Sequence, residues 1–161
     1  VCTGNLFVGT NGKGITFETS NNNGIGGDST LLDDYEVGTF TLTFKASSSD
    51  PTTSDVTANA RYIKVGDLVW VSFMVNRVDI DNAGSGTARL GGLPFTVHNS
   101  NPTPWGTFTH VNDKWPSSAA PVAVYGRTNT DLMQITEYNG SQVNWNVANE
   151  YYFGGSLVYY S

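Results

Sequence analysis

The sequence predicts an all-β fold with almost no helix, in the form of a β-sandwich or jelly roll. Gly occurs 18 times in 161 residues and charged residues make up only 14%, a balance that favours short strands joined by polar turns. No window of the chain places apolar residues at the spacing that an amphipathic helix needs. About ten short strand-like runs follow one another at regular spacing, as in a sandwich or jelly roll.

The first 30 residues differ in style from the rest of the chain. Two short β-prone runs within residues 5–19 are joined by a Gly-rich turn, and residues 20–30 are polar and rich in Gly. Runs this short cannot bury a core alone. We expect residues 1–30 to form a stalk-like β segment with a linker, and residues 31–161 to form a β-sandwich head.

The head begins with a clear strand pattern. Residues 38–46 alternate between apolar and polar, with Phe40, Leu42 and Phe44 on one face. This period of two predicts one half-buried strand. Residues 47–55 are rich in Ser, Thr, Asp and Pro and therefore predict a loop.

Two further runs, residues 61–65 and 68–75, are separated by Gly66 and Asp67 and predict a β-hairpin. The second run is apolar on both faces, because side chains such as Trp70 lie opposite its valines. A strand with two apolar faces fits a sandwich interior or a subunit interface.

A corner is expected at Gly91, Gly92 and Pro94, where regular strand pairing must end. Residues 97–105 are polar and irregular in pattern. The strands expected beyond them have weaker patterns and fall at residues 106–111, 121–126, 132–138 and 150–160.

Three sequence blocks stand in order in the middle of the chain. Residues 31–41 open with Leu-Leu-Asp-Asp-Tyr-Glu, residues 62–71 surround the Gly66-Asp67 turn, and residues 92–95 read Gly-Leu-Pro-Phe. Together these blocks resemble the C-terminal head domain of bacteriophage tail fibres, including those of cyanophages. The resemblance ends before Thr96.

The resemblance implies a homotrimer, in which an intertwined β stalk leads into three β-sandwich heads. It implies a protein of the virion, outside the host cell, whose N-terminal side holds other virion proteins and whose head attaches to a glycan or protein on the host surface without catalysis. Two alternatives stay open: a structural fibre or capsid-decoration protein without a specific ligand, and a polysaccharide depolymerase.

Charge and hydropathy exclude other classes of partner. The net charge of −6 and the pI near 4.6, with scattered Lys and Arg, argue against nucleic acid, because phosphate binding needs clustered cations. No apolar run is long enough to span a bilayer, so we expect no membrane insertion. The single cysteine, Cys2, excludes an internal disulfide.

Acidic residues form no convincing metal or catalytic pattern. Asp79 and Asp81 begin like a calcium loop, but Ala83 and Leu90 occupy positions that need oxygen ligands. The acids at residues 33–36 fit hydrogen bonding at the start of a strand. Carboxylates of the C-terminal half show no paired spacing for glycan hydrolysis, and no nucleophile motif accompanies the two histidines. We expect no metal, no cofactor and no enzymatic activity.

Aromatic residues are enriched after residue 96, and aromatic rings stack on the C–H faces of sugars. Two tryptophans lie in the polar stretch 99–118, which predicts an exposed loop, and neighbouring His and Asp side chains offer hydrogen bonds to hydroxyl groups. The alternative is that these rings pack beneath the loop or at a trimer contact. The ligand-binding candidates are Trp105, His110, Asp113, Trp115 and Trp145.

Overall fold

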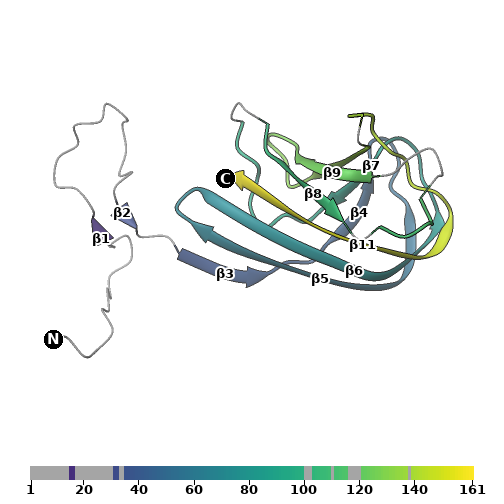
Figure 1. Ribbon diagram of the computed structural model, residues 1–161, viewed down its shortest axis with the longest axis horizontal. Coiled ribbons are helices and arrows are strands. Elements are labelled where there is room, and N and C mark those ends of the chain that lie inside the picture. The colour runs from purple at the N-terminus through teal and green to yellow at the C-terminus, as the bar shows by residue number, and fades with distance from the viewer. Residues whose placement is uncertain are drawn as a thin grey trace.

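One curled antiparallel sheet of nine strands accounts for most of the described residues (Figure 1). The computed structural model describes residues 15–16, 31–32, 35–99, 103–109, 111–115, 121–137 and 139–161. These residues contain no helix, and hence none that could cross a membrane. The all-β prediction is confirmed.

Within the described residues, eleven strands follow one another along the chain. They are β1 (Ile15–Thr16), β2 (Leu31–Leu32), β3 (Tyr35–Thr39), β4 (Thr43–Ala46), β5 (Thr52–Val65), β6 (Leu68–Asn82), β7 (Ala88–Gly91), β8 (Trp105–Thr109), β9 (Pro121–Gly126), β10 (Met133–Glu137) and β11 (Ala148–Tyr160). The spatial order in the large sheet is β3-β5-β6-β11-β8-β9-β10-β7-β4. β1 pairs with β2 in a separate two-stranded sheet, across the boundary predicted at residue 30. The rest of the predicted stalk, residues 1–14 and 17–30, lies outside the described residues.

The alternating stretch at residues 38–46 forms two strands rather than one. β3 ends at Thr39 on one edge of the sheet, paired with β5, whereas β4 begins at Thr43 on the opposite edge, paired with β7. The Phe40 N–H still donates to the Ala60 carbonyl oxygen at 3.1 Å. The prediction of a single strand is wrong because alternation reports which face a residue occupies and not which strand is its partner.

The short crossing at residues 40–42 makes the sheet curl. Because these few residues connect the two edge strands, both edges must lie close together. Leu42 in the crossing and Phe44 just after it are buried. Figure 1 shows the result, with the long strands β5, β6 and β11 on one side of the body and the shorter strands β8, β9 and β7 on the other.

β5 and β6 form the predicted hairpin. Gly66 in its turn has a φ of +56°, in the region that glycine adopts without strain. The hairpin is longer than predicted, because β5 starts at Thr52, inside the stretch expected to be a loop. Three register shifts lie in its distal half, around Asp55 with a φ of +46°, and such bulges bend a strand pair.

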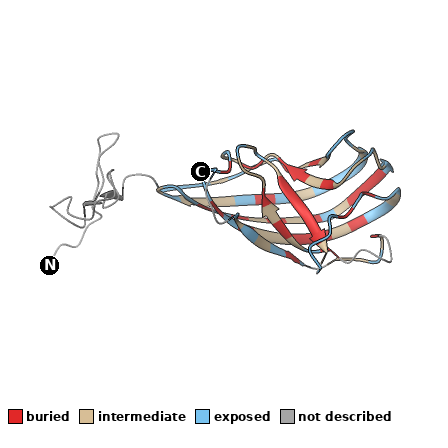
Figure 2. Cartoon of the chain, turned by 90° about the horizontal axis from the view of Figure 1, so that it is seen from above, coloured by how far each residue is buried: buried red, intermediate tan, exposed pale blue. Residues whose placement is uncertain are grey.

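The core lies inside the curl, as the buried stretches in Figure 2 show. It is rich in aromatic rings. Phe108 of β8 stacks on Phe153 of β11 with ring centroids 4.9 Å apart. Phe44 of β4 meets Phe153 edge-on from the other end of the sheet order. Contacts of this kind tie strands together that do not pair by backbone hydrogen bonds.

β6 is apolar on both faces, as predicted, but only one face is buried along its length. Val69, Val71, Phe73 and Val75 are buried, whereas Trp70 is 38% exposed. Trp70 belongs to two rows of apolar side chains that run across β3, β5, β6 and β11 on the outward face, which we call the apolar end. The rows are Tyr35, Val65, Leu68 and Tyr160, and Val37, Ile63, Trp70 and Val158.

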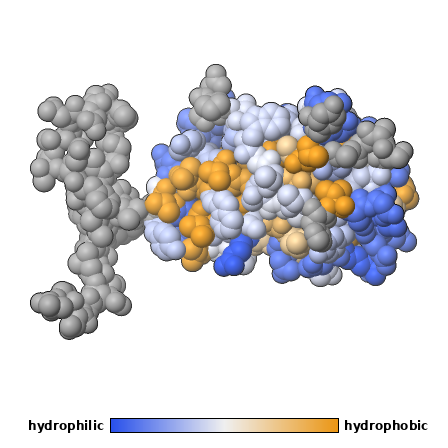
Figure 3. Space-filling view, in the orientation of Figure 1, coloured by the Kyte–Doolittle hydropathy of each residue, from blue (hydrophilic) through white to orange (hydrophobic). Residues whose placement is uncertain are grey.

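The apolar end leaves a large hydrophobic surface facing solvent, where β3 begins and β11 ends. Figure 3 shows hydrophobic residues gathered at this end of the body. Seven of its eight side chains are exposed, Ile63 being the half-buried member. An exposed apolar patch of this kind is typical of an interaction surface. At the apolar end, the outward face of β6 is therefore not part of a sandwich interior within this chain, and the subunit interface stays a prediction.

We expect Gly92→Ala to destabilise the protein by more than about 3 kcal/mol, since a collision with backbone leaves little room to relax. Gly92 has a φ of +87°, and a Cβ there would collide with the carbonyl oxygen of Thr41 in the crossing. The control is Gly140→Ala, because Gly140 has a φ of +83° and nothing within reach of an added Cβ. It should lose only about 1–2 kcal/mol. Equal losses for both variants in urea unfolding would contradict the role of this contact.

Candidate functional site

An aromatic pair, an exposed tryptophan beside a half-buried tyrosine, lies on the outward face of the sheet. Trp105 at the start of β8 is 57% exposed. It lies opposite Tyr125 of β9 in the strand register. The two ring centroids are 5.1 Å apart and the planes are inclined at 48°. We call these two residues the aromatic platform. An exposed indole beside a phenol is a surface on which a sugar ring can stack.

A shallow recess of about 160 Å³ adjoins the aromatic platform. Its lining is mostly polar and comprises Thr103, Tyr125, Gly126, Arg127 and Thr128. The recess is small beside the 300–1,000 Å³ typical of pockets for drug-sized ligands. It can therefore hold one functional group of a ligand whose remainder rests on the surface.

The turn after β9 holds the recess in place. The Arg127 N–H donates to the Leu132 carbonyl oxygen at 2.9 Å. The carbonyl oxygen of Arg127 accepts a bond of 2.7 Å from the Thr130 hydroxyl. On the other side, the Gly126 N–H donates to the Pro104 carbonyl oxygen at 3.0 Å. These hydrogen bonds fix the backbone of Gly126 and Arg127, so that the Arg127 side chain starts from a fixed position beside the aromatic platform.

Two of the predicted ligand-binding residues lie in the core instead. Trp115 is 5% exposed and Trp145 is 4% exposed. Their ring centroids are 5.1 Å apart. The Trp145 indole N–H donates to the Lys45 carbonyl oxygen at 2.7 Å. The expectation that Trp115 is exposed in a loop is wrong, because burying an indole against Tyr151 and Phe153 outweighs its polar flanking sequence.

The other predicted residues do not join the aromatic platform. Asp113 is exposed and lies 3.7 Å from Lys114, in the segment that follows β8. Trp105 begins β8, which ends at Thr109, so Asp113 lies beyond the opposite end of that strand. His110 lies outside the described residues. Of the five candidates, the structure leaves Trp105 as the exposed aromatic one.

A second, larger hollow of about 580 Å³ opens where β3 parts from β5. Thr39, Phe40, Asn59, Arg61 and Met74 are among its lining residues. The hollow is a consequence of the crossing, because beyond Ala60 no strand continues β3 along the edge of β5. Its lining residues do not include an exposed tryptophan of the kind that distinguishes the aromatic platform.

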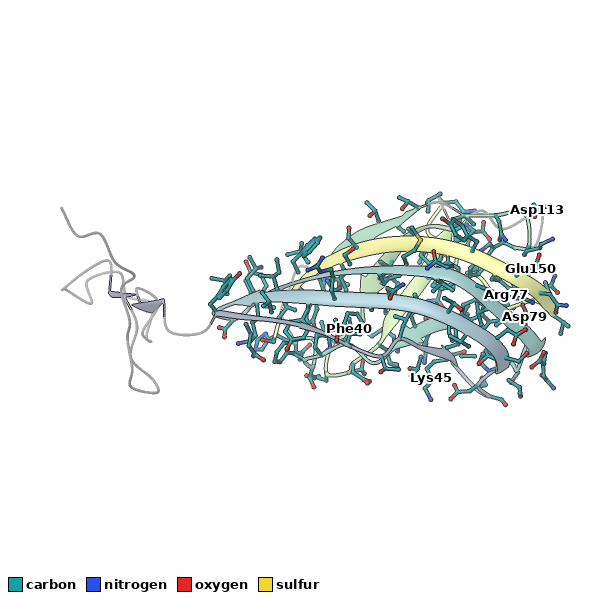
Figure 4. All side chains as sticks on the ribbon, turned by 90° about the horizontal axis from the view of Figure 1, so that it is seen from below. Phe40, Lys45, Arg77, Asp79, Asp113 and Glu150 are labelled. Atoms are coloured by element: carbon teal, nitrogen blue, oxygen red, sulfur yellow. The ribbon has the colours of Figure 1, made fainter. Side chains whose placement is uncertain are left out.

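Three carboxylates gather around Arg77 at the end of the sheet away from the apolar end (Figure 4). The distances from its guanidinium nitrogens to oxygens of Asp79, Asp55 and Glu150 are 3.1, 3.4 and 3.7 Å. The hydrogen bonds from Arg77 and from the Glu150 N–H lower the pKa of Asp79. A general acid for glycan hydrolysis needs a raised pKa, so Asp79 is unsuited to that role. Among the described residues, no group of His, Cys, Asp and Glu side chains is arranged to hold a metal ion.

The sequence pattern could have indicated that Tyr125 faces outward, although it did not make this residue a binding candidate. Residues 121–126 were predicted as a strand, and the period of two opposes Val124 and Tyr125. Since Val124 is fully buried, Tyr125 must face outward. What the sequence could not reveal is that β8 becomes the neighbour of β9 and places Trp105 against Tyr125.

Trp115→Ala should lower the free energy of unfolding by about 3–5 kcal/mol, because it leaves a cavity in the aromatic core. Trp105→Ala should change it by less than about 0.5 kcal/mol, because the ring is largely exposed. Urea unfolding followed by circular dichroism compares the two variants. A Trp115→Ala protein as stable as the unmodified chain would refute the buried placement.

Comparison of the chain with protein-family models, with curated proteins and with solved structures found no match, so a functional proposal rests on the residues described above.

Proposed function

We propose that this chain is the receptor-binding head of a bacteriophage tail fibre, a β-sandwich that attaches the virion to a host surface glycan as a homotrimer and without catalysis. The resemblance of residues 31–95 to tail-fibre heads supports the family and the setting outside the host cell. The N-terminal side would then hold other virion proteins, and the remaining surface of the head would face the host.

The observation that carries the binding proposal is the pair of exposed Trp105 and half-buried Tyr125. Monomeric proteins bury most of the area of a tryptophan ring, so an indole that is 57% exposed beside a second ring is unusual without a partner. Tyr125 also accepts a hydrogen bond of 3.3 Å from the Gln142 amide at its hydroxyl. The rings offer stacking, and the amide and threonine hydroxyls beside them offer hydrogen bonds to sugar hydroxyls.

The apolar end supports the homotrimer. Its two cross-strand rows of eight apolar side chains form a larger apolar patch than monomeric proteins usually expose. Contact with another copy of the chain would remove these side chains from water. The sequence had suggested either a core or a subunit interface for the second face of β6. Since Trp70 is not in the core of this chain, the interface is the interpretation that accounts for it.

A structural fibre or capsid-decoration protein is the second candidate. Gly106 lies opposite Leu157, so Trp105 lies next to Val158 and the aromatic platform continues the apolar end. In a structural fibre, a neighbouring subunit would cover Trp105 together with the apolar end. A depolymerase would need two carboxylates across a groove, and the acids around Arg77 are held in ion pairs instead.

Trp105→Ala should weaken adsorption of the protein to a strain that binds the unmodified chain by at least about tenfold, since an exposed aromatic anchor dominates a small interface. Trp105→Phe should retain part of the binding, because a ring remains. Val147→Ala removes another exposed apolar side chain and should have no effect. Adsorption of fluorescently labelled protein to cells measures all three. Unchanged adsorption of Trp105→Ala would reject the aromatic platform as the receptor site.

Trp70→Glu should convert a trimer to monomers in light scattering, because it places a charge in the middle of the proposed interface. Val147→Glu is the matched control, with the same charge at an exposed apolar position outside the two rows. Trp105→Ala should leave the mass unchanged. If Trp105→Ala also dissociates the trimer, the structural candidate is favoured. A monomer for the unmodified chain would contradict the trimer.

A further inference from the structure

Two arginine side chains lie on the outward face beside the aromatic platform. In the strand register, Arg89 of β7 lies opposite Gln134 of β10, and Gln134 lies opposite Tyr125 of β9. Arg127 follows Tyr125 by two residues and lines the same recess. The period of two therefore puts both guanidinium groups on the face that carries the tyrosine ring.

Arg89 is held from below by a buried amide. Gln134 is fully buried, and its side-chain oxygen accepts bonds from the Arg89 Nε–H at 3.0 Å and from the Thr87 hydroxyl at 3.3 Å. The Gln134 amide nitrogen donates to the Ala88 carbonyl oxygen at 2.8 Å. A fully bonded buried amide is rigid. It fixes the Arg89 side chain through Nε and leaves the outer guanidinium nitrogens for another acceptor.

Neither arginine is neutralised within the part of the chain that the structure describes. Three other cations there have acidic partners: Lys45 pairs with Asp50, Lys114 with Asp113, and Arg77 with three carboxylates. No ion pair joins Arg89 or Arg127 to a described carboxylate, although the protein carries a net charge of −6.

The two guanidinium groups are also close enough to oppose each other. Partial burial lowers the pKa of Arg89, and the positive charge of Arg127 lowers it further. Two like charges without a counterion destabilise each other, and an anion between them would remove this repulsion.

We propose that Arg127 and Arg89 bind the carboxylate of an acidic sugar whose ring stacks on Trp105. This inference rests on the proposed function and narrows it to glycans that carry uronic or similar acids. The recess of about 160 Å³ has room for a carboxylate, while the sugar ring stays on the open platform. A guanidinium group matches the planar carboxylate with two parallel hydrogen bonds. The hydroxyls of Thr103 and Thr128 line the same recess and offer further donors.

The test is a titration followed by NMR on protein labelled in its arginine and tryptophan side chains. The probes are D-glucuronate, D-glucose, which has the same ring without the carboxylate, and inorganic phosphate. We expect glucuronate to shift the Arg127 Nε–H and Trp105 indole signals together. Glucose should shift Trp105 alone and bind about tenfold more weakly, the factor expected for charge-assisted hydrogen bonds. Phosphate should shift the arginine signals without Trp105.

Arg127→Gln should remove the preference for glucuronate and leave the weaker glucose binding unchanged. Arg61→Gln is the matched control, because it makes the same change of charge on β5, four strands away from β9 in the sheet, and it should keep the preference. Arg89→Gln should also lose the preference. Its circular dichroism spectrum checks that loss of the bond to Gln134 leaves the fold intact.

Two kinds of result would overturn the inference. Equal affinity for glucuronate and glucose, with both shifting Trp105, would reject the carboxylate site and leave the sugar platform standing. Equal losses in Arg127→Gln and Arg61→Gln would show a general effect of charge and would also reject it. If neither sugar shifts Trp105 while phosphate shifts Arg127, both the acidic-sugar site and the glycan-binding function fail, and only an anion site remains.

Discussion

The crossing at residues 40–42 is the constraint on which the rest of the structure depends. It joins β3 on one edge of the sheet to β4 on the other, so a nine-stranded sheet must curl until its edges lie close together. Gly92 lets the chain approach the Thr41 backbone at this point, where no side chain would fit. Curling sends one face of most strands of the sheet into an aromatic core and turns the other face to solvent, whereas β3 contributes no buried residue. The outward face then becomes the surface on which any partner must act.

Three regions of this outward face differ in chemistry. The apolar end crosses β3, β5, β6 and β11, the aromatic platform follows on β8 and β9, and the two arginines lie around β10. The apolar end suits contact with another copy of the chain, and the aromatic platform suits stacking of a sugar ring. The two arginines carry positive charge that suits an anion. The arrangement fits a protein that assembles at one end and binds a charged glycan beside that contact.

Sequence patterns predicted what depends on neighbours in the chain. The β5–β6 hairpin was found because Gly66 and Asp67 form a local turn signal, and residues 121–126 were found as a strand with matching bounds. The crossing at residues 40–42 was missed because the choice of partner strand is made by residues far away in the sequence. Trp115 was misplaced for the same reason: its burial depends on Phe108, Tyr151 and Phe153, and not on the polar residues beside it. Arg127 became a candidate only when the register placed it near Arg89 and Trp105.

The tryptophans offer the most direct test of recognition at the aromatic platform, since the chain has four of them, in three environments. Their indole N–H signals can be followed in one NMR spectrum while surface polysaccharide from an adsorbing host is added to the protein. We predict that the Trp105 signal shifts, that Trp115 and Trp145 stay fixed in the core, and that Trp70 stays fixed in the proposed subunit contact. A shift of Trp70 with Trp105 unchanged would place recognition on the apolar end and contradict the platform as the binding site, as would shifts confined to Trp115 or Trp145.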